Sequence, residues 1–282
     1  MNFVKIWGAL GGTPGHNNVD QNFIGHTPCV EVNCGKNCRY IFDAGSGFVD
    51  CAKSSYSIKG LFFSHFHLDH VQGLWTSDVN KYGDVYYGMP FVSGAPDGYT
   101  LDQALSQLMS PPLVPKALSW HAYKVFMSPR LVVVEDGGTF ECEDEGHRVS
   151  FAKVVHGKSE SYAMRFDEAC SGGGKSVVYA TDVDAGASHD KLVALAQNAN
   201  LLIIDTHYTD AEYDALPSPR PHSCPRVAAA VAKAAKVKLV CTFHHGSDGY
   251  SPKAGNVLAE VRKHLSDPDM AVIGRTGFRI DL

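Results

Sequence analysis

Four side chains that can bind metal ions stand close together early in the chain. They are His65, His67, Asp69 and His70, in the stretch SHFHLDH. The chain has 14 histidines among 282 residues, so random composition rarely produces such a density. Neutral imidazole and carboxylate suit zinc first, and also manganese or iron, because no thiolate stands here to favour a softer ion. The motif therefore predicts a metal centre.

The apolar run before the motif predicts how these side chains are presented. A strand over Leu61 to Ser64 would end where the motif begins. Side chains two residues apart leave a strand on the same side, so His65 and His67 would point together. A tight turn would then bring Asp69 and His70 to a neighbouring position. One pair could hold one metal ion, and the other pair a second.

The spacing H-x-H-x-D-H resembles the signature of the metallo-β-lactamase superfamily, which stands at the end of an inner strand. The resemblance implies a third histidine, a carboxylate that bridges two metal ions, and a last histidine near the C-terminus. The candidates are His156, Asp182 and His244, with His245 as the alternative to His244. It also implies that Asp43 orients a ligand histidine, although an aspartate that caps its own turn fits the same sequence.

The same resemblance implies a fold and a complete ligand set. The fold would be a four-layer αββα sandwich, in which outer helices cover two mixed sheets. Seven side chains would hold two divalent ions, zinc by expectation, with manganese and iron as alternatives. They are His65, His67 and His156 for one ion, Asp69, His70 and His244 for the other, and Asp182, which would bridge both together with a hydroxide.

Four further stretches resemble the ribonuclease Z and cyclic phosphodiesterase branch of that superfamily. They are Thr27 to Val32, Val178 to Asp182, Asp205 to Asp210 and Pro221 to Ser223. In that branch, a carboxylate at the Asp205 position pairs with a histidine at the His222 position, which donates a proton or contacts phosphate. A carboxylate raises the pKa of an imidazole and fixes its tautomer, as a general acid requires. Cys224 departs from the residue usual in that branch.

We therefore expect a metal-dependent hydrolase of a small cyclic phosphodiester, with His222, Asp205 and Asp69 as catalytic residues. The stretch from Asp182 to Leu201 is too short for the tRNA-clasping arm common in ribonuclease Z. A net charge of −5 also repels phosphate polymers, so a small anion fits better than a long nucleic acid. A lactone or thioester hydrolase with the same metals is the alternative, and a metal-dependent sensor without catalysis is a further one.

The composition predicts one soluble domain over residues 1–282. Apolar residues make up 44% of the chain, and no linker divides it. The N-terminus shows neither a signal-peptide pattern nor a long apolar span, so we expect a cytoplasmic protein without a membrane segment. The oligomeric state stays open, a homodimer included.

Cys34 and Cys38 flank a predicted turn, and a structural zinc shared with Cys29 or Cys51 is the alternative.

Periodicity predicts a mixed α/β chain, with strands in the first half and alternating strands and helices in the second. Leu101 to Met109 has helical spacing. Leu131 to Val134 is expected to join three later strands, 139–142, 148–155 and 161–166, in a second sheet. Ser223 is the expected N-cap of a helix from Cys224 to Lys236.

The segment 78–130 is long and directly follows the metal motif. Its aromatic residues are Tyr86, Tyr87, Phe91, Tyr99, Trp120, Tyr123 and Phe126. We expect an insertion that roofs the pocket and selects the substrate, and the alternative is that these aromatics are ordinary core. His16, His26 and His207 receive no role from the sequence.

Overall fold

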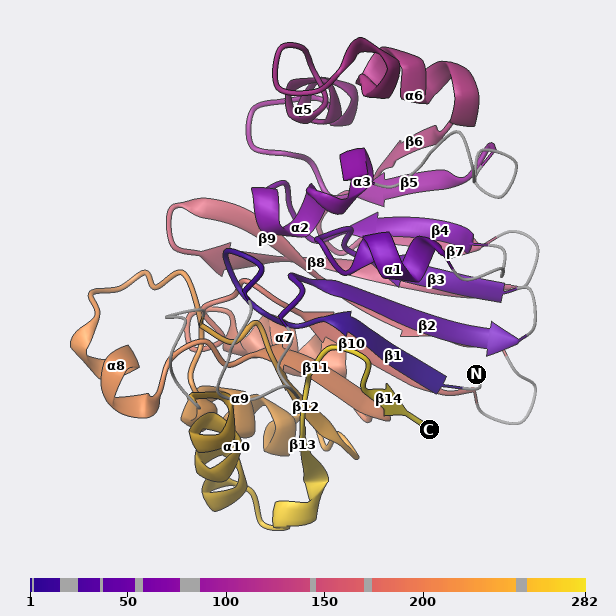
Figure 1. Cartoon of the computed structure of the whole chain (residues 1–282). Helices are drawn as coiled ribbons and strands as arrows, with labels where there is room; N and C mark the ends of the chain where they lie inside the picture. Colours follow the sequence, from indigo (N-terminus) through magenta and orange to yellow (C-terminus); the bar gives the residue numbers. More distant parts are fainter. Residues whose placement is uncertain are drawn as a thin grey trace.

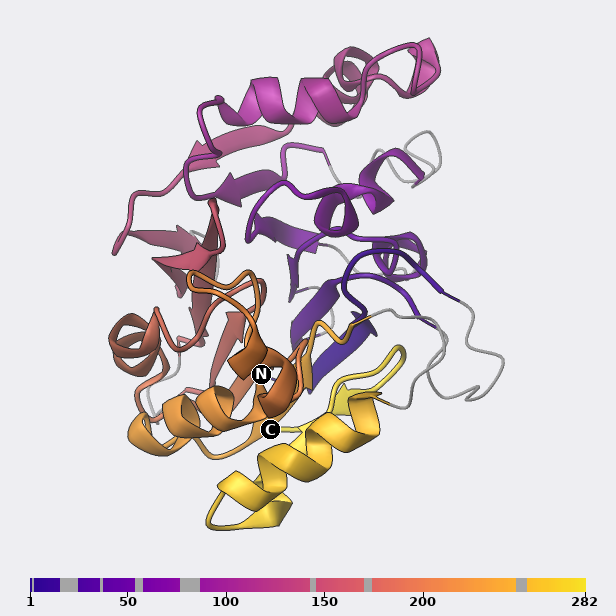
Figure 2. The same ribbon diagram turned by 90° about the vertical axis from the view of Figure 1, so that its left-hand side faces the viewer.

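Two seven-stranded β-sheets face each other, and helices cover their outer faces (Figures 1 and 2). The computed structural model describes residues 1, 3–15, 25–35, 38–53, 58–76, 87–142, 146–169, 174–246 and 253–282. This arrangement confirms the predicted αββα sandwich. Within the described ranges, no helix is both long enough and apolar enough to span a membrane.

The first sheet is built mainly from the N-terminal half of the chain. Its strands are β1 (Phe3–Gly8), β2 (Cys29–Gly35), β3 (Cys38–Phe42), β4 (Ile58–Phe63), β5 (Pro90–Ser93), β6 (Arg130–Val133) and β14 (Arg279–Ile280). They run in the order β14-β1-β2-β3-β4-β5-β6. Strands β3 to β6 are parallel, so their carboxyl ends lie at one edge of the sheet.

The second sheet comes from the C-terminal half. Its strands are β7 (Thr139–Cys142), β8 (His147–His156), β9 (Ser159–Asp167), β10 (Ser176–Ala180), β11 (Leu201–Asp205), β12 (Val240–Phe243) and β13 (Ala271–Ile273). They run in the order β13-β12-β11-β10-β9-β8-β7, and β10 to β13 are parallel. Strands β10 and β11 are buried along their whole length, as expected for parallel strands covered on both faces.

Each sheet carries helices on its outer face (Figure 1). On the first sheet these are α1 (Phe48–Ala52), α2 (Leu68–Val71), α3 (Gly73–Thr76), α5 (Leu101–Leu108) and α6 (Trp120–Met127), and on the second α7 (His189–Ala196), α9 (Pro225–Ala234) and α10 (Lys253–His264). The described residues also form α8 (Asp210–Ala215) and the short 3-10 helices Lys116–Leu118 and Pro268–Met270.

Three buried clusters hold these layers together. The cluster between the sheets includes Phe42, Phe62, Phe166 and Phe243. The other two lie between each sheet and its helices. Burial of this much apolar surface from both sides is the dominant favourable contribution to folding, and it fixes the distance between the two sheets.

Two sequence expectations were wrong. The strand expected over Leu131 to Val134 belongs to the first sheet, where β6 pairs parallel to β5, and α5 and α6 lie in the connection that such pairing requires. Ser223 does not cap α9, because Cys224 occupies the N-cap position. The Ser223 hydroxyl donates instead to the carbonyl of Val183 and accepts the N–H of Ala185 at 2.7 Å.

The expected roof segment divides between core and surface. Phe91, Trp120 and Tyr123 are buried against the first sheet, whereas Tyr99 is 51% exposed and Phe126 is 53% exposed. Residues 77–86, which include Tyr86, lie outside the described residues. The aromatics of this segment are therefore ordinary core in part only.

Candidate metal centre

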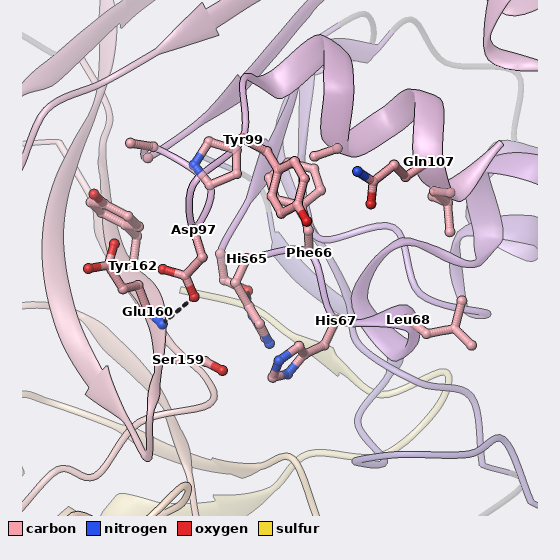
Figure 3. Close-up of a pocket in the computed structure, with 16 residues that line it drawn as sticks. His65, Phe66, His67, Leu68, Asp97, Tyr99, Gln107, Ser159, Glu160 and Tyr162 are labelled. Carbon is pink, nitrogen blue, oxygen red and sulfur yellow. Dashed lines mark hydrogen bonds between the residues drawn. The ribbon is translucent and has the colours of Figure 1, made fainter. Parts of the chain in front are cut away.

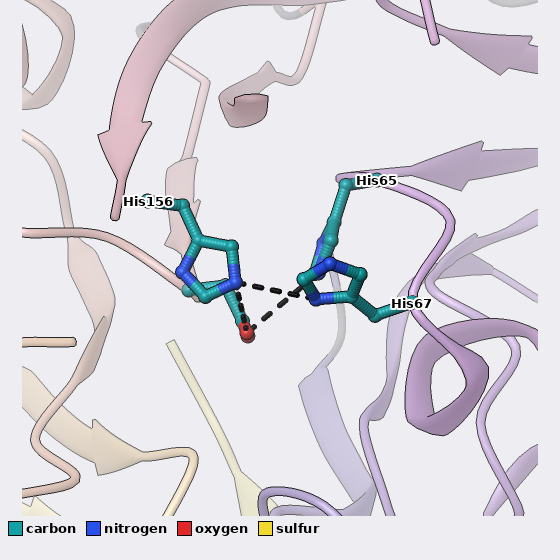
Figure 4. A group of neighbouring side chains, drawn as sticks. His65, His67 and His156 are labelled. Carbon is teal, nitrogen blue, oxygen red and sulfur yellow. Dashed lines mark hydrogen bonds and ion pairs between the residues drawn. The ribbon is translucent and has the colours of Figure 1, made fainter. Parts of the chain in front are cut away.

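Three histidines and one carboxylate form the first group of ligand atoms. His65, His67, His156 and Asp182 offer donor atoms that all lie within 4.8 Å of one another. Figure 4 shows the three imidazoles turned toward a common point from two sides. His65 and His67 follow β4 of the first sheet, whereas His156 ends β8 of the second. The group therefore lies across the gap between the sheets.

A second group lies beside the first. Asp69, His70 and His244 offer donor atoms within 4.8 Å of one another. Asp182 lies between the two groups, and each of its two carboxylate oxygens faces one of them. Oδ1 lies 3.0 Å from Nε2 of both His70 and His244. Oδ2 faces the first group, 3.4 Å from His156 Nε2 and 3.7 Å from His65 Nε2.

Hydrogen bonds fix which nitrogen of each imidazole points into the cluster. Asp43 accepts the Nδ1 proton of His70 at 2.7 Å. The hydroxyl of Ser64 donates to Asp43 at 2.7 Å and accepts the Nδ1 proton of His65 at 3.0 Å. His156 donates its Nδ1 proton to the carbonyl of Pro221. In each of these rings, Nε2 is left with a lone pair for the cluster.

The donor set fits divalent metal ions. Nε2 of His65 is buried and has no hydrogen-bond partner, although it faces a carboxylate. Burial lowers the pKa of His65 and of His156, which favours the neutral, ligand-ready imidazole. Burial alone would raise the pKa of Asp182, but the neighbouring His244 and His70 hold it well below its usual range. Neutral imidazoles around a charged carboxylate are suited to bind a divalent metal ion.

His244, rather than His245, faces the cluster. His244 Nε2 lies 3.3 Å from Asp69 Oδ2, whereas His245 turns away and donates to the carbonyl of Gly274 at 3.1 Å. Gly11 makes room for the His244 ring, because a Cβ at Gly11 would come within 2.5 Å of it. The two adjacent histidines thus have separate surroundings.

Beside the metal ligands, a second carboxylate and histidine form a pair. His222 donates its Nδ1 proton to Asp205 Oδ2 at 2.8 Å. Asp205 is fully buried and also accepts the backbone N–H groups of His207 at 3.0 Å and Ser223 at 3.3 Å. Burial lowers the pKa of His222, but the charge and hydrogen bond of Asp205 outweigh it and raise the pKa to about 9.

The pair opens onto the same cleft as the metal ligands. The cleft has a volume of about 810 Å³, and its walls include His67, His156, Asp182, His222 and His244. A hydrogen-bonded imidazole, the Asp182 carboxylate and two groups of possible metal ligands thus surround one space. The arrangement can hold two cations, bind an anion and supply a proton.

The sequence as a whole decides the family. It matches the family model described as "Beta-lactamase superfamily domain" over residues 38–245, which is more than half of the chain. The chain belongs to the metallo-β-lactamase superfamily. No curated protein matches the sequence.

Several solved structures share the fold over nearly their whole length. The metallo-β-lactamase fold protein YhfI from Bacillus subtilis is 18% identical, with a TM-score of 0.71, and the match covers 99% of this chain and 98% of that one. Human tRNase Z, short form, is 17% identical, with a TM-score of 0.66 and coverage of 99% and 98%. A diphosphatase from the PhnP family is 16% identical, with a TM-score of 0.63 and coverage of 100% and 98%.

Some contacts in this superfamily member were not anticipated from the sequence. His207 stacks on His222, with ring centroids 4.3 Å apart and planes at 17°, and its Nδ1 donates to the carbonyl of His244 at 3.2 Å. The backbone N–H of Gly12 donates to Asp69 at 2.8 Å. The hydroxyl of Tyr179 donates to Asp43 at 2.8 Å. His207 lies in a motif that the sequence singled out, whereas the other two carried no signal.

The remaining histidine and cysteine candidates lie elsewhere. His26 contacts Ser46 and Asp50 and does not join the cluster, and His16 lies outside the described residues. The donor atoms of Cys34, Cys38 and His147 lie within 4.8 Å of one another, whereas Cys29 and Cys51 belong to no such group among the described residues. Nδ1 of that imidazole accepts a backbone N–H at 2.9 Å, so its other nitrogen carries the proton. This tautomer favours hydrogen bonding over metal binding.

Proposed function

We propose that the protein is a dinuclear metal-dependent phosphodiesterase that hydrolyses a small cyclic phosphodiester. The observation that carries this proposal is the Asp205 and His222 pair, hydrogen-bonded at 2.8 Å beside Asp182. A hydrolase that expels a poor alkoxide leaving group needs a proton donor next to its metal ions. A lactone or thioester hydrolase with the same metals does not need this pair.

The proposed ligands divide as the geometry groups them. His65, His67 and His156 would hold one ion, Asp69, His70 and His244 the other, and Asp182 would contact both. Zinc fits these nitrogen and oxygen donors best, and manganese or iron is the alternative. Two such ions would supply Lewis acidity and water of lowered pKa.

The protein itself positions the proton. Asp205 accepts from Nδ1 of His222, so the proton to be transferred stands on Nε2, the nitrogen that Asp205 leaves free. Asp205 is in turn held by backbone N–H groups, which fix the ring plane of His222. His207 stacks on one face of that ring and restricts its rotation. His222 would protonate the leaving alkoxide, and Asp205 would stabilise the imidazolium until then.

Three observations support a small phosphate ester as the substrate. A cleft of about 810 Å³ has room for a compact molecule. The net charge of −5 disfavours a long polyanion, so local cations must attract the phosphate. Two structures that share the fold, a tRNase Z and a diphosphatase, carry names that denote phosphate chemistry.

The test compares two diesters that differ in their leaving group. In His222→Ala, turnover of a diester with an alkoxide leaving group should fall by about 100- to 10,000-fold, the contribution of one positioned proton donor. Turnover of a p-nitrophenyl diester should fall much less, because p-nitrophenolate leaves without a proton. Both metal ions should remain bound. His121→Ala, an exposed histidine on α6, is the matched control.

Asp205→Asn should show the same pattern more weakly, since it removes the charge that holds the imidazolium. Equal losses on both diesters would make His222 a phosphate contact instead of a proton donor. No loss on either diester, together with turnover of a lactone or thioester, would refute the phosphodiesterase proposal.

A further inference from the structure

A second cavity, which His222 does not line, adjoins the metal centre. Its volume is about 370 Å³, within the range of about 300 to 1,000 Å³ typical of small-molecule sites. His67 lines both this cavity and the metal cleft, so the two spaces meet at a proposed metal ligand. The walls come from the motif loop, from the segment 94–99 with α5, and from the start of β9 (Figure 3).

The lining offers apolar surface with a few polar groups. Phe66, Leu68, Tyr99 and Leu108 supply rings and aliphatic carbons, and Gln107 supplies an amide. Figure 3 shows the Tyr99 and Phe66 rings and the Gln107 amide among the side chains that line the cavity. Leu68 is 61% exposed and Tyr99 is 51% exposed. Large apolar side chains left open around a concave space are typical of a surface that a ligand covers.

The charge of the cavity disfavours anions. No lysine or arginine stands among the described residues that line it, and both of its charged side chains are acidic. Asp97 accepts the backbone N–H of Glu160 at 3.1 Å, and the Glu160 carboxylate pairs with Lys153. A phosphate group in this cavity, in addition to one at the metal centre, would be repelled by the Asp97 carboxylate. The ammonium group of Lys153 would not offset this repulsion, because it already pairs with Glu160. An uncharged group with hydrogen-bond donors would be accepted.

The walls are fixed to each other across the two sheets. The backbone N–H of Tyr162 on β9 donates to the carbonyl of Ser64, beside the metal motif, at 2.9 Å. Gly94 lies against the Tyr162 ring so closely that an added Cβ would overlap the ring carbons. The distance between the cavity and the metal ligands is therefore set by strand pairing and close packing, and the space exists before a ligand arrives.

We propose that this cavity binds the uncharged organic group of the substrate, a nucleobase or another planar ring, while the phosphate lies at the metal centre. The inference rests on the proposed function and narrows its substrate class. Apolar walls favour a ring, Gln107 and Asp97 can hydrogen-bond to its edge, and the acidic rim rejects a second phosphate. The cavity belongs in part to the segment 78–130, so that segment selects the substrate.

The kinetic test fills the cavity without touching a metal ligand. Ala104 of α5 lines it, and Ala104→Trp would occupy the space. Val125→Trp, on the exposed face of α6 at 65% exposure, places the same indole outside the cavity as a control. Three diesters are compared: ethylene phosphate, a cyclic diester without an aromatic ring, phenyl p-nitrophenyl phosphate and cyclic AMP. Ala104→Trp should lower kcat/KM about tenfold or more for the last two and leave kcat/KM for ethylene phosphate unchanged.

Direct binding separates this proposal from the proposed function. Wild-type protein is titrated calorimetrically with two uncharged probes, adenosine and p-nitrobenzyl alcohol, and at least one should bind. Its binding should be lost in Ala104→Trp and kept in Val125→Trp. A nucleobase site binds adenosine better, and a general ring site binds the benzyl compound equally well.

Two results would overturn the cavity proposal. One is that neither probe binds the wild-type protein. The other is that Ala104→Trp lowers kcat/KM for all three diesters alike. If no diester is hydrolysed but a probe binds as described, the phosphodiesterase proposal fails and the cavity remains a ring-binding site.

Discussion

Asp182 sits where two sets of ligands meet, and this position gives it a different task from the histidines around it. Each of its oxygens faces imidazoles of a separate group, at 3.0 Å for Oδ1 and at 3.4 to 3.7 Å for Oδ2. A carboxylate is the side chain that can present two equivalent oxygens in this way. Loss of Asp182 would therefore disturb both halves of the centre, whereas other ligands belong to one half.

Substitution of Asp69 tests whether the ligands form two separate metal sites. It contacts His70 and His244 but belongs to no group with His65. Asp69→Ala should therefore release one of two bound ions and leave the other in place. Elemental analysis of the reconstituted protein should give two ions per chain for the wild type and one for the variant. A wild type with one ion or none would contradict the dinuclear centre.

At the residue scale, the sequence predicted which side chains form the cluster of possible metal ligands. It did not predict the hydrogen bonds that orient them. The order of His65, Asp182 and His244 along the chain was readable because the resemblance to the superfamily implies in which order the ligands follow one another. Tyr179 on Asp43 was not readable, because it needs strand β10 to lie against the end of β3. A hydrogen bond across 136 residues depends on packing, which no local pattern encodes.

At the scale of elements, the site is collected at the carboxyl ends of parallel strands. Asp43 follows β3, His65 follows β4, Asp182 follows β10 and His244 follows β12, while Asp205 ends β11. Parallel neighbours place such ends at one sheet edge, where ligand sites commonly form. The sequence predicted most of these strands, but it put β6 in the wrong sheet because strands close in sequence more often pair with each other.

Helix α9 shows another limit of local reading. Its N-cap Cys224 makes no side-chain cap, and Asp210 from α8 accepts the N–H of Arg226 instead, at 2.9 Å. The same carboxylate accepts from His264 of α10 at 2.6 Å. The cap is supplied by a residue far from the helix start in sequence, so Ser223 was the best local candidate and the wrong one.

The contact between Asp210 and the start of α9 predicts how the stability of the protein depends on pH. Burial raises the pKa of Asp210, but the Arg226 N–H and other hydrogen bonds outweigh it and hold the pKa below its ordinary value of 3.8. A lowered folded-state pKa means that the stabilisation is complete above 3.8 and disappears as pH falls through the folded-state value. Asp210→Asn should thus be destabilised at pH 7 by about 1 kcal/mol, and the difference should shrink in acid.

Urea unfolding of both proteins from neutral to acid pH measures this effect. Asp214→Asn is the control, because Asp214 lies on the same helix but pairs with Arg226 at the surface, where ion pairs contribute little. An Asp210→Asn deficit that stays constant down to the lowest pH would show that the charge is not what stabilises α9.

For the whole molecule, the metal centre is a link between two halves. The first sheet supplies His65, His67 and His70, and the second supplies His156, Asp182 and His244. Bound ions would join sheets that otherwise hold together through apolar contact and scattered hydrogen bonds. The cavity next to the centre is a product of the same assembly, since its walls come from both sheets. Its shape could not be predicted from sequence, because it depends on how the sheets meet.

Metal removal should therefore weaken the whole fold. An ion that binds only the folded state at about 100 times its Kd adds about 2.7 kcal/mol, and each kcal/mol shifts Tm by about 2 to 4 °C for a chain near this size. Dialysis against a chelator should lower the Tm of the wild type, and zinc should restore it. Asp182→Asn should respond far less to either treatment. Equal Tm values with and without metal would argue against a link between the sheets.

Asp43, Asp182 and His244 share a backbone conformation that L-residues rarely adopt, with φ of 57°, 47° and 56°. Glycine adopts this conformation freely, whereas a side chain there costs about 1 to 2 kcal/mol. Asp182→Gly should therefore unfold at a higher temperature than Asp182→Ala in metal-free protein, although both lack the ligand. Calorimetry of the two apo variants measures the difference, and equal Tm values would show that the backbone is unstrained.

The same backbone strain predicts which substitutions accumulate in homologous sequences. While the chemistry is under selection, aspartate and histidine should persist at these three positions despite the backbone strain there. Once selection for the chemistry ends, random substitution at Asp182 should drift first toward glycine, because that change removes the backbone strain, whereas the hydrogen bonds that Asp43 accepts still favour aspartate there. A lineage with an intact H-x-H-x-D-H motif but glycine in place of Asp182 would then mark a protein that has kept the fold and abandoned its reaction.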